Sequence, residues 1–492
     1  MKNHHLALLF VLISYFGYSQ SLTAKLIDTS NNPIPFATIE TAKNKGVISN
    51  DEGVFTINLK DVSNNSIEIN CLGFSTKKIT IKEISANNNI IILEEHINEL
   101  NQVYISNTKP NADEIIAKVN QNLSNNYNHE NQSYNLFFRN TSYMDFNRLE
   151  FTIDKASGIR KKKLAGANQS LDSLMQAIKN TKAVHFRDYL ANLYIKNKEE
   201  AKLDVAKATS LIDKNQNVSI DQIQENAQHL ILKYLDTTKT YKLKTGIIKI
   251  EDSLELNNSN NESEENKNEY EVNSLKSETH ELLYTSQTYE NTTLNKIINA
   301  DLYKYEFIDT TVFNGELVYI IEYFPRRSKA KYTGKIYVTD DSYAVIKIDY
   351  AFAKGKRGEK LNLKFLLGIK YVENIKQGTI IFQKNEDNIY QPQYIKQESG
   401  NFFYVNRPLK FIENSPSKNK VLFNFLIEGG MREKNEIYFI SNSSLNGNDF
   451  NNYKEPKTIK YQKLKQYDPE IWKAYNAIEP LEEMKQFKST ED

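Results

Sequence analysis

The sequence predicts an α+β, β-rich protein with an N-terminal β-sandwich, a helical middle region and a C-terminal curved antiparallel sheet covered by helices. Three observations carry this prediction. Short alternating runs of apolar and polar residues, separated by turn-forming residues, fill the first part of the chain after residue 20. The same period-two alternation returns from Tyr303 to Ile440. The chain also contains 30 Tyr and 24 Phe, which suit half-buried sheet surfaces.

The first twenty residues predict a secretory signal peptide over 1–20, because an apolar run from Leu6 to Phe16 precedes small residues. No later stretch reaches the eighteen or so uninterrupted apolar residues of a transmembrane helix, so we expect none. A lipid anchor would need a Cys directly after the apolar run, whereas the single Cys is Cys71. We therefore expect an exported protein, periplasmic or associated with the outer membrane.

Net charge argues against one class of partner. Lys and Arg number 63 and Asp and Glu number 62, which leaves a formal charge of +1. A balance this even gives no global field for capturing nucleic acid, so we expect no nucleic-acid partner. One Cys also excludes an intramolecular disulfide, so each domain must rest on its own core.

Residues 21–105 predict the sandwich. Pro33 and Pro35 forbid a helix and lead into a strand that alternates from Phe36. The "NDEG" turn at 50–53 then returns the chain into "VFTINL", whose apolar residues share one face. Further short alternations follow at regular spacing, as in a small two-sheet sandwich.

The order of these motifs resembles a known family. "PIPFATI", "GVISNDEGVFTI", "INCLGFSTKKITI" and "IIILEEHINELNQVYI" together resemble the carboxypeptidase-regulatory-like domain, a transthyretin-type sandwich of exported bacterial proteins. The resemblance implies a non-catalytic structural or interaction module. It also implies packing roles for Ala37, Ile39, Phe55, Ile57, Ile69 and Phe74.

Two motifs invite a metal hypothesis. His96 and Glu99 have the HxxE spacing of two zinc ligands, but a catalytic zinc site needs a third protein ligand, and no downstream segment provides that context. "HELLY" at His280–Tyr284 has Tyr where HExxH needs its second His, and it favours a strand edge. We expect neither a metal site nor a cofactor.

The middle region, 106–250, is predicted to be α+β and to pack on the C-terminal sheet. Asn111 caps a helix of about twelve residues, "SYNLFFRNTSY" alternates as a strand, and helical spacing dominates from Leu171 to Tyr241. "RKKK" at 160–163 is typical of a solvated loop. Residues 251–279 are rich in Asn, Ser and Glu, which predicts a disordered acidic insertion.

Residues 280–492 predict an antiparallel sheet domain with C-terminal helices, in which Trp472 anchors the last segment on the sheet. "VYIIEYFP" and "YTGKIYVTDDSYAVIKIDY" resemble the half-barrel of the LolA and LolB type, a curved sheet closed by helices that shelters lipid acyl chains. That resemblance implies an apolar cavity, and a solid core is the alternative for the same residues. The expected lining residues are Tyr319, Ile321, Ile346, Phe365 and Phe423.

These features together predict a non-enzymatic envelope protein. The sandwich would be a docking or structural module, and the C-terminal sheet a platform for a lipid-like ligand or an envelope or outer-membrane protein. One alternative is a glycan-uptake accessory protein, whose aromatic side chains stack on sugars. Another is a hydrolase whose site is not visible as a sequence motif, since no nucleophile elbow or phosphate-binding loop occurs.

Overall fold

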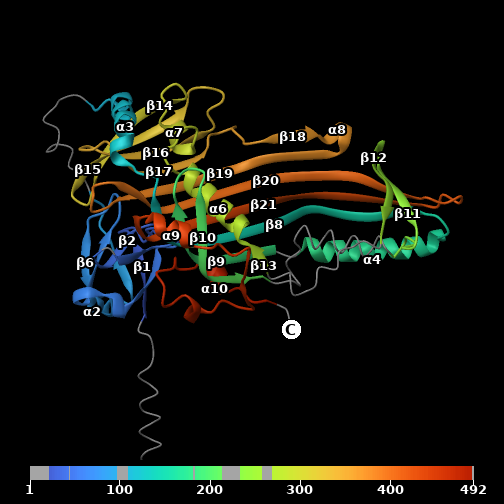
Figure 1. Ribbon diagram of the computed structural model, residues 1–492, viewed down its shortest axis with the longest axis horizontal. Coiled ribbons are helices and arrows are strands. Elements are labelled where there is room, and N and C mark those ends of the chain that lie inside the picture. The colour runs from blue at the N-terminus through green and yellow to red at the C-terminus, as the bar shows by residue number, and fades with distance from the viewer. Residues whose placement is uncertain are drawn as a thin grey trace, which may run out of the picture.

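The computed structural model describes residues 21–43, 45–96, 109–180, 183–212, 233–256 and 269–489. The predicted signal peptide and Glu99 lie outside these ranges. A small N-terminal unit lies against one end of a large sheet, and the central strands of that sheet continue away from it as a long arm (Figure 1). We call the crowded end of the large sheet the body.

The N-terminal unit is a sandwich of two small sheets, with strand orders β4–β1–β7 and β3–β2–β5–β6. Their inward-facing apolar residues, among them Phe55 and Ile39, form a separate buried core. The elements are β1 (Ser21–Ile27), β2 (Thr38–Ala42), β3 (Lys45–Ile48), β4 (Val54–Asn58), η2 (Leu59–Asp61), η3 (Ser63–Asn65), β5 (Ser66–Asn70), β6 (Lys77–Thr80), α2 (Ile81–Ala86) and β7 (Ile90–Ile92).

The large sheet has the strand order β14–β15–β16–β17–β19–β20–β21–β8–β9–β10–β23, and all of these neighbours are antiparallel except β10 and β23. Its strands are β8 (Gln132–Ala156), β9 (Ala183–Ile195), β10 (Ala201–Leu211), β11 (Thr240–Thr245), β12 (Ile248–Glu255), β14 (Tyr303–Phe313), β15 (Glu316–Pro325), β16 (Tyr332–Thr339), β17 (Val345–Phe352), β18 (Lys360–Leu363), β19 (Ile369–Lys384), β20 (Tyr390–Glu413), β21 (Lys420–Ser444) and β23 (Gln462–Leu464). A short pair, β13 (Glu269–Glu271) and β22 (Thr458–Lys460), lies outside it.

Helices cover parts of the large sheet. They are α3 (Ala112–Asn126), α4 (Lys161–Lys179), α6 (Val272–Thr285), α7 (Thr293–Ile297), α8 (Lys364–Leu367), α9 (Gly447–Asn452), the 3₁₀ turn η5 (Pro469–Ile471) and α10 (Glu482–Lys485). In the body, α3, α6 and α7 bury their apolar residues against one sheet face, and α4 runs along the arm (Figure 1). The predicted class, α+β and β-rich with an N-terminal sandwich and a curved sheet covered by helices, is confirmed.

The middle of the chain differs from the prediction, because Ala183–Leu211 forms the strands β9 and β10 instead of helix. β9 and the end of β10 are largely buried on both faces, and apolar residues occur at most positions of β9, so its period-two signal is lost. β8 pairs with β21, so strands from 106–250 complete the C-terminal sheet. The end of the predicted helical stretch, including 220–231, lies outside the described residues.

Three local predictions need correction. Residues 251–255 lie in β12 and 269–279 in β13 and α6, so these parts of the predicted acidic insertion form regular structure, and residues 257–268 lie outside the described residues. His280–Tyr284 also lies within α6, where helical spacing buries Leu282 and Leu283, and not at a strand edge. Lys161–Lys163 form the first turn of α4 instead of a loop.

The "NDEG" turn docks the sandwich on the large sheet. Asp51 forms ion pairs with Lys396 of β20 at 2.5 Å and with Lys434 of β21 at 3.4 Å. The Asn50 side-chain amide donates to the backbone carbonyl oxygens of Glu479 and Pro480. The turn therefore joins the sandwich to both the sheet and the C-terminal segment.

Phe36 and Trp472 add apolar contacts at the same junction. Phe36 precedes β2 instead of continuing it, and its φ of 61° is a strained conformation for a large side chain. Its ring stacks on Tyr394 at a centroid distance of 5.0 Å. Trp472 is 5% exposed and meets Phe137 edge to face, as expected for an anchor of the last segment on the sheet.

One buried ion pair crosses the centre of the sheet. Arg139 of β8 donates from Nε and Nη2 to the two carboxylate oxygens of Asp188 of β9, at 2.9 and 2.7 Å. Arg139 is 4% exposed and Asp188 is 1% exposed. Removing either partner would leave an uncompensated charge in the interior, so this pair constrains the pairing of β8 with β9.

We expect Arg139→Met to lower the free energy of unfolding by about 3–5 kcal/mol, because Asp188 would keep a buried charge without its partner. Denaturant unfolding of the full chain measures the change. The control is Arg148→Met on the same strand, whose ion pair with Glu150 is about half exposed and should contribute less than about 1 kcal/mol. Equal losses in the two variants would contradict this account.

We expect Asp51→Lys to detach the sandwich, because the new ammonium group would face Lys396 and Lys434. Small-angle X-ray scattering should then give a larger radius of gyration than for the native chain. Glu386→Lys reverses one charge of an exposed ion pair across the same junction and should leave the scattering unchanged. An unchanged radius for Asp51→Lys would refute the docking role.

We expect the free energy of unfolding to decrease as the pH is lowered, because of the buried imidazole of His129. Burial lowers the pKa of its imidazole to about 4, whereas an unfolded chain binds the proton near pH 6.5. Between these values the unfolded state binds more protons, so the unfolding free energy falls as pH drops from about 6.5 to 4. His129→Gln should reduce that fall by roughly 1–3 kcal/mol in denaturant titrations across this pH range. Identical pH profiles would contradict the assignment.

Candidate functional site

The arm has one continuous apolar face, which the strand registers define. Directly paired residues in antiparallel strands project from the same face of a sheet. One such row crosses five strands in succession, from β18 through β19, β20 and β21 to β8: Leu363, Ile369, Val405, Ile427 and Leu149. We call this side of the arm the apolar face.

Two β-bulges keep β8 in phase with its neighbours. The pairing of β8 with β21 shifts register three times, and the two shifts within the arm leave Asp154 and Asn147 of β8 as extra, exposed residues. Each bulge moves the alternation by one position, so Ile153, Leu149 and Phe146 all lie on the apolar face. Without the bulges, half of this strand would turn its apolar residues to the polar side.

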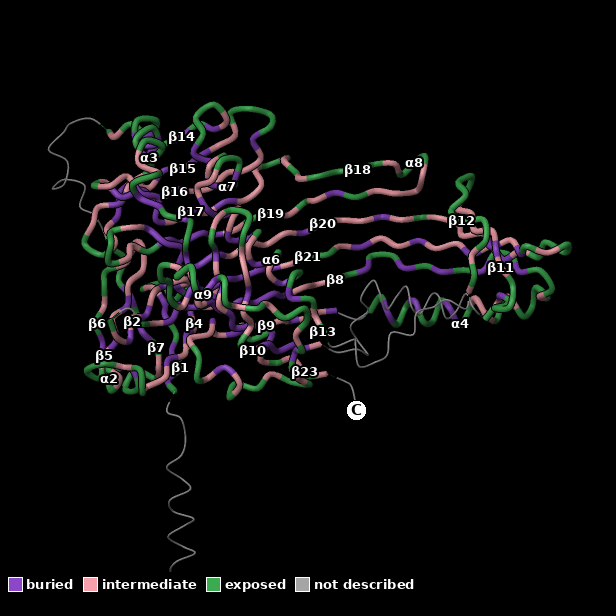
Figure 2. The backbone as a smooth tube through the Cα atoms, viewed as in Figure 1, coloured by how far each residue is buried: buried purple, intermediate pink, exposed green. Residues whose placement is uncertain are grey.

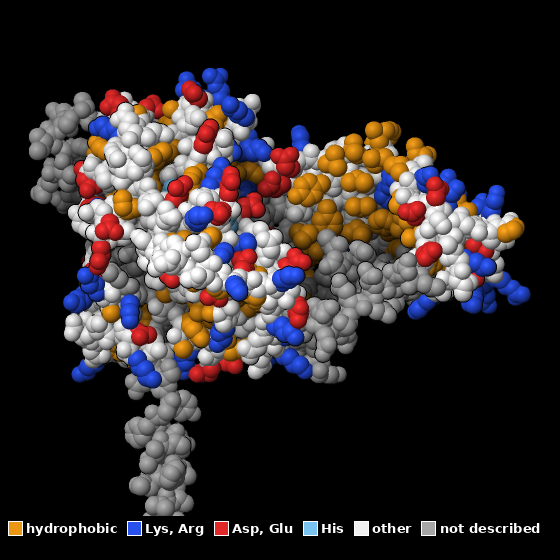
Figure 3. Space-filling model, in the orientation of Figure 1, with side chains coloured by type: hydrophobic (Ala, Val, Ile, Leu, Met, Phe, Trp, Pro, Cys, Tyr) orange, Lys and Arg blue, Asp and Glu red, His pale blue; other side chains and the backbone are white. Residues whose placement is uncertain are grey.

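Cover over the apolar face is uneven. Apolar residues of α4, including Leu171 and Met175, bury the β8 side, so Leu149 is buried. Toward β18 the cover ends: Leu363, Ile369 and Val405 are only half-buried, and Tyr371 is 38% exposed. Hydrophobic side chains accordingly gather on the surface between the body and the far end of the arm (Figure 3).

The opposite side of the arm is more polar. Along β8, residues between the apolar positions, such as Glu150 and Thr152, are exposed, and buried and exposed residues alternate along the strand (Figure 2). On β21, Asn424 and Glu428 alternate with the apolar residues. The second side of the arm is therefore more polar than the apolar face, although Leu426, Tyr404 and Val372 on that side are buried.

Arg407 fixes the far end of the arm. Its guanidinium donates to the Leu367 carbonyl after β18 and to the Thr245 hydroxyl and carbonyl oxygens in the β11–β12 hairpin. Gly368 has a φ of 63°, and a Cβ there would lie 2.1 Å from the Asn406 carbonyl oxygen, so only glycine permits this close turn. The same turn leaves Phe365 99% exposed at the tip.

At the body end, the apolar face runs into a charged pocket beneath α6. The pocket measures about 550 Å³, and strands β9, β19, β20 and β21 form its floor. We call it the α6 pocket. Its lining residues are Arg187, Glu278, Glu281, Leu282, Thr285, Thr293, Lys376, Gln397, Glu433 and Asn435.

Charges in the α6 pocket are only partly compensated. Arg187 lies 3.4 Å from Glu278, and burial, together with the nearby Glu433 carboxylate, raises the pKa of Glu278 against the effect of Arg187. Glu433 accepts a hydrogen bond from the Asn140 side-chain amide at 2.7 Å. Burial lowers the pKa of Lys376, and surrounding carboxylates oppose that shift. Polar ligands of either charge would therefore find a partner here.

The structure does not bring together the five residues predicted to line one cavity. Ile321 and Ile346 are buried in the body core, with Tyr319 packed at its margin. Phe423 lies in the separate core beneath α4. Phe365 is at the exposed tip, because Lys364–Leu367 form a helical turn and not the predicted strand. Of the five, only Phe423 belongs to the apolar face.

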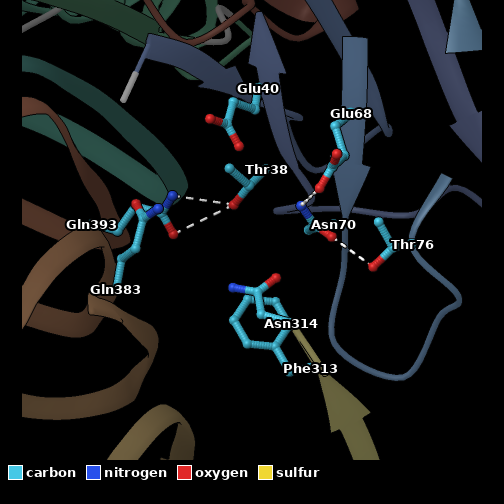
Figure 4. Close-up of a pocket in the computed structure, with 9 residues that line it drawn as sticks. All are labelled: Thr38, Glu40, Glu68, Asn70, Thr76, Phe313, Asn314, Gln383 and Gln393. Carbon is cyan, nitrogen blue, oxygen red and sulfur yellow. Dashed lines mark hydrogen bonds between the residues drawn. The ribbon is translucent and has the colours of Figure 1, made fainter. Parts of the chain in front are cut away.

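A second pocket lies between the sandwich and the large sheet (Figure 4). It measures about 290 Å³. Gln393 of β20 donates to the Thr38 hydroxyl at 3.1 Å, and Asn70 accepts from Thr76 at 2.7 Å. Carboxylates, amides and one ring complete the lining: Glu40, Glu68, Gln383, Asn314 and Phe313. These groups suit a ligand rich in hydroxyl groups.

Within the part of the chain that the structure describes, no three His, Cys, Asp or Glu side chains are grouped to hold a metal ion. His96 is exposed at the end of the sandwich. Among the same residues, none of the helices combines the length and hydropathy needed to cross a membrane.

Comparisons with known proteins support the N-terminal assignment. Residues 22–105 match the family model of the CarboxypepD_reg-like domain, which confirms the resemblance found in the motifs of this segment. No curated protein matches the chain. Among solved structures, a DUF1329 family protein from Desulfovibrio piger is similar at 9% sequence identity and a TM-score of 0.17, over 64% of this chain and 89% of that chain.

Proposed function

We propose that this chain is a non-enzymatic envelope protein that binds a lipid-like ligand on the apolar face of its arm. The observation that carries the proposal is the row from Leu363 to Leu149, in which only Leu149 is buried. Leaving such a surface in water costs roughly 25 cal/mol for each Å². Large exposed apolar surfaces of this kind commonly mark binding sites.

Polarity along the arm favours a lipid over a protein partner. The apolar face extends for several residues on each strand and ends, on the body side, at charged residues of the α6 pocket. A lipid has the same order, with an apolar chain joined to a polar group. A protein partner would instead need matching apolar residues along the length of the arm. It is the competing occupant of the apolar face.

We place the protein in the periplasm or at the outer membrane, after export. The predicted signal peptide and the CarboxypepD_reg-like domain at 22–105 support this placement. The sandwich acts mainly as a structural module, because its "NDEG" turn already contacts the large sheet and the C-terminal segment of the same chain. Docking to another envelope protein would use other surfaces of the sandwich.

Glycan binding is the second candidate, supported by the pocket between the sandwich and the large sheet (Figure 4). Its carboxylates and amides could bond sugar hydroxyl groups beside the Phe313 ring. The apolar face has no role in this alternative. Soluble oligosaccharide that binds the chain and is unaffected by a charge on the apolar face would favour it.

We expect Val405→Asp to reduce binding of a fluorescent long-chain fatty acid at least tenfold, because the ligand would have to desolvate a carboxylate in the middle of the apolar face. Equilibrium titration of the purified full chain measures the affinity.

Asn406→Asp is the matched control, since it adds one carboxylate to the same strand but on the opposite, exposed face. It should bind like the native chain. If both variants bind the fatty acid as the native chain does, the apolar face is not the site. If the native chain binds no fatty acid and sediments as a complex with another protein from the envelope, the partner reading replaces the lipid proposal.

A further inference from the structure

The α6 pocket and the apolar face are parts of one surface. Met431 and Glu433 are two residues apart on β21 and project from the same side, so they lie about 7 Å apart along the strand. Asn401 and Ser399 of β20 are their direct partners. On β21 the surface therefore changes from an apolar to a charged side chain within one step along the strand.

The arm is long enough to hold an acyl chain whose polar end occupies the α6 pocket. Ten residues separate Met431 from Val421, which corresponds to about 33 Å of strand. A single acyl chain fills half of a bilayer's hydrocarbon core, or about 15 Å. An amphiphile bound with its polar group beneath α6 would thus lie wholly on the arm.

The charges of the α6 pocket specify the polar group. Two cations, Arg187 and Lys376, stand against the three carboxylates of Glu278, Glu281 and Glu433. Arg187 is occupied by Glu278. Lys376 has neither a hydrogen bond nor an ion pair with any residue that the structure describes, so it can receive an anion. The excess of carboxylate favours a ligand that also carries a cation.

The form of that cation follows from the lining. Carboxylates accept hydrogen bonds, and a primary ammonium group has three N–H donors to offer. A quaternary ammonium group has none and is usually held by aromatic rings, yet among the residues that the structure describes no aromatic side chain lines the α6 pocket. A headgroup with only negative charge would meet the excess carboxylate unfavourably.

We propose that the α6 pocket binds the headgroup of a phospholipid that carries a phosphate and a primary ammonium group, as in the ethanolamine type. Lys376 receives the phosphate, and Glu281 and Glu433 receive the ammonium group. The assignment rests on the proposed function, because the acyl chains lie on the apolar face.

Three diacyl phospholipids with identical short chains and ethanolamine, choline or glycerol headgroups test the assignment. Each is titrated calorimetrically into the full chain below its critical micelle concentration. We expect the ethanolamine lipid to bind roughly tenfold tighter than the other two, as charge-assisted hydrogen bonds in a partly exposed pocket would give. Glycerophosphoethanolamine, which lacks acyl chains, should bind far more weakly than the diacyl lipid.

Variants separate the headgroup assignment from the proposed function. Glu281→Gln, at an exposed position, should weaken the ethanolamine lipid more than the choline lipid and so reduce the preference, whereas Lys376→Met should weaken all three lipids, because each carries a phosphate. Val405→Asp should weaken all three lipids. Equal native affinities for the three headgroups, with Val405→Asp still weakening all of them, would overturn the headgroup assignment alone. No binding of any lipid, or native-like binding by Val405→Asp, would overturn both proposals.

Discussion

The pairing of β8 with β21 is the constraint on which the rest of the structure depends. β8 comes from the middle of the chain and β21 from near its end, and their register runs from Val421 with Ala156 to Ser444 with Gln132. This pairing joins the meander β14–β21 to β9 and β10, so one sheet serves both the body and the arm. In the body it places Arg139 opposite Glu436, and in the arm it makes the apolar face continuous.

The sequence predicts the parts of this fold whose signals are local. Prolines and the "NDEG" turn delimit the sandwich strands, and clear alternation marks the C-terminal strands. β9 could not be predicted from alternation, because its residues are largely buried on both faces. The helical turn α8 could not be predicted, because its four residues, including the exposed Phe365, are as apolar as those of a strand. Pairing between segments far apart in the chain leaves no local signal at all.

The candidate site is harder to predict than the fold, for a geometric reason. Val405, Ile427 and Leu149 share a face only through the strand registers, and β8 reaches that register only through bulges at Asp154 and Asn147. A bulge has no reliable sequence signature, so "MDFNRLEFTID" looks irregular. Lys376 and Glu281 likewise come from a strand and a helix about a hundred residues apart. The predicted cavity residues shared alternation and apolar character, which identify buried strands but not which strands meet.

The central position of β8 also dictates the order in which the protein can mature. Asn140 and Asn435, hydrogen-bonded neighbours in the sheet, are 295 residues apart in the chain. During synthesis β8 therefore emerges long before β21, its partner in the sheet. In that interval the hydrophobic edge of β8 is unpaired. The large sheet therefore cannot form while the chain is still being synthesised. A holding chaperone that shields β8 until β21 has been synthesised would protect the chain during this interval.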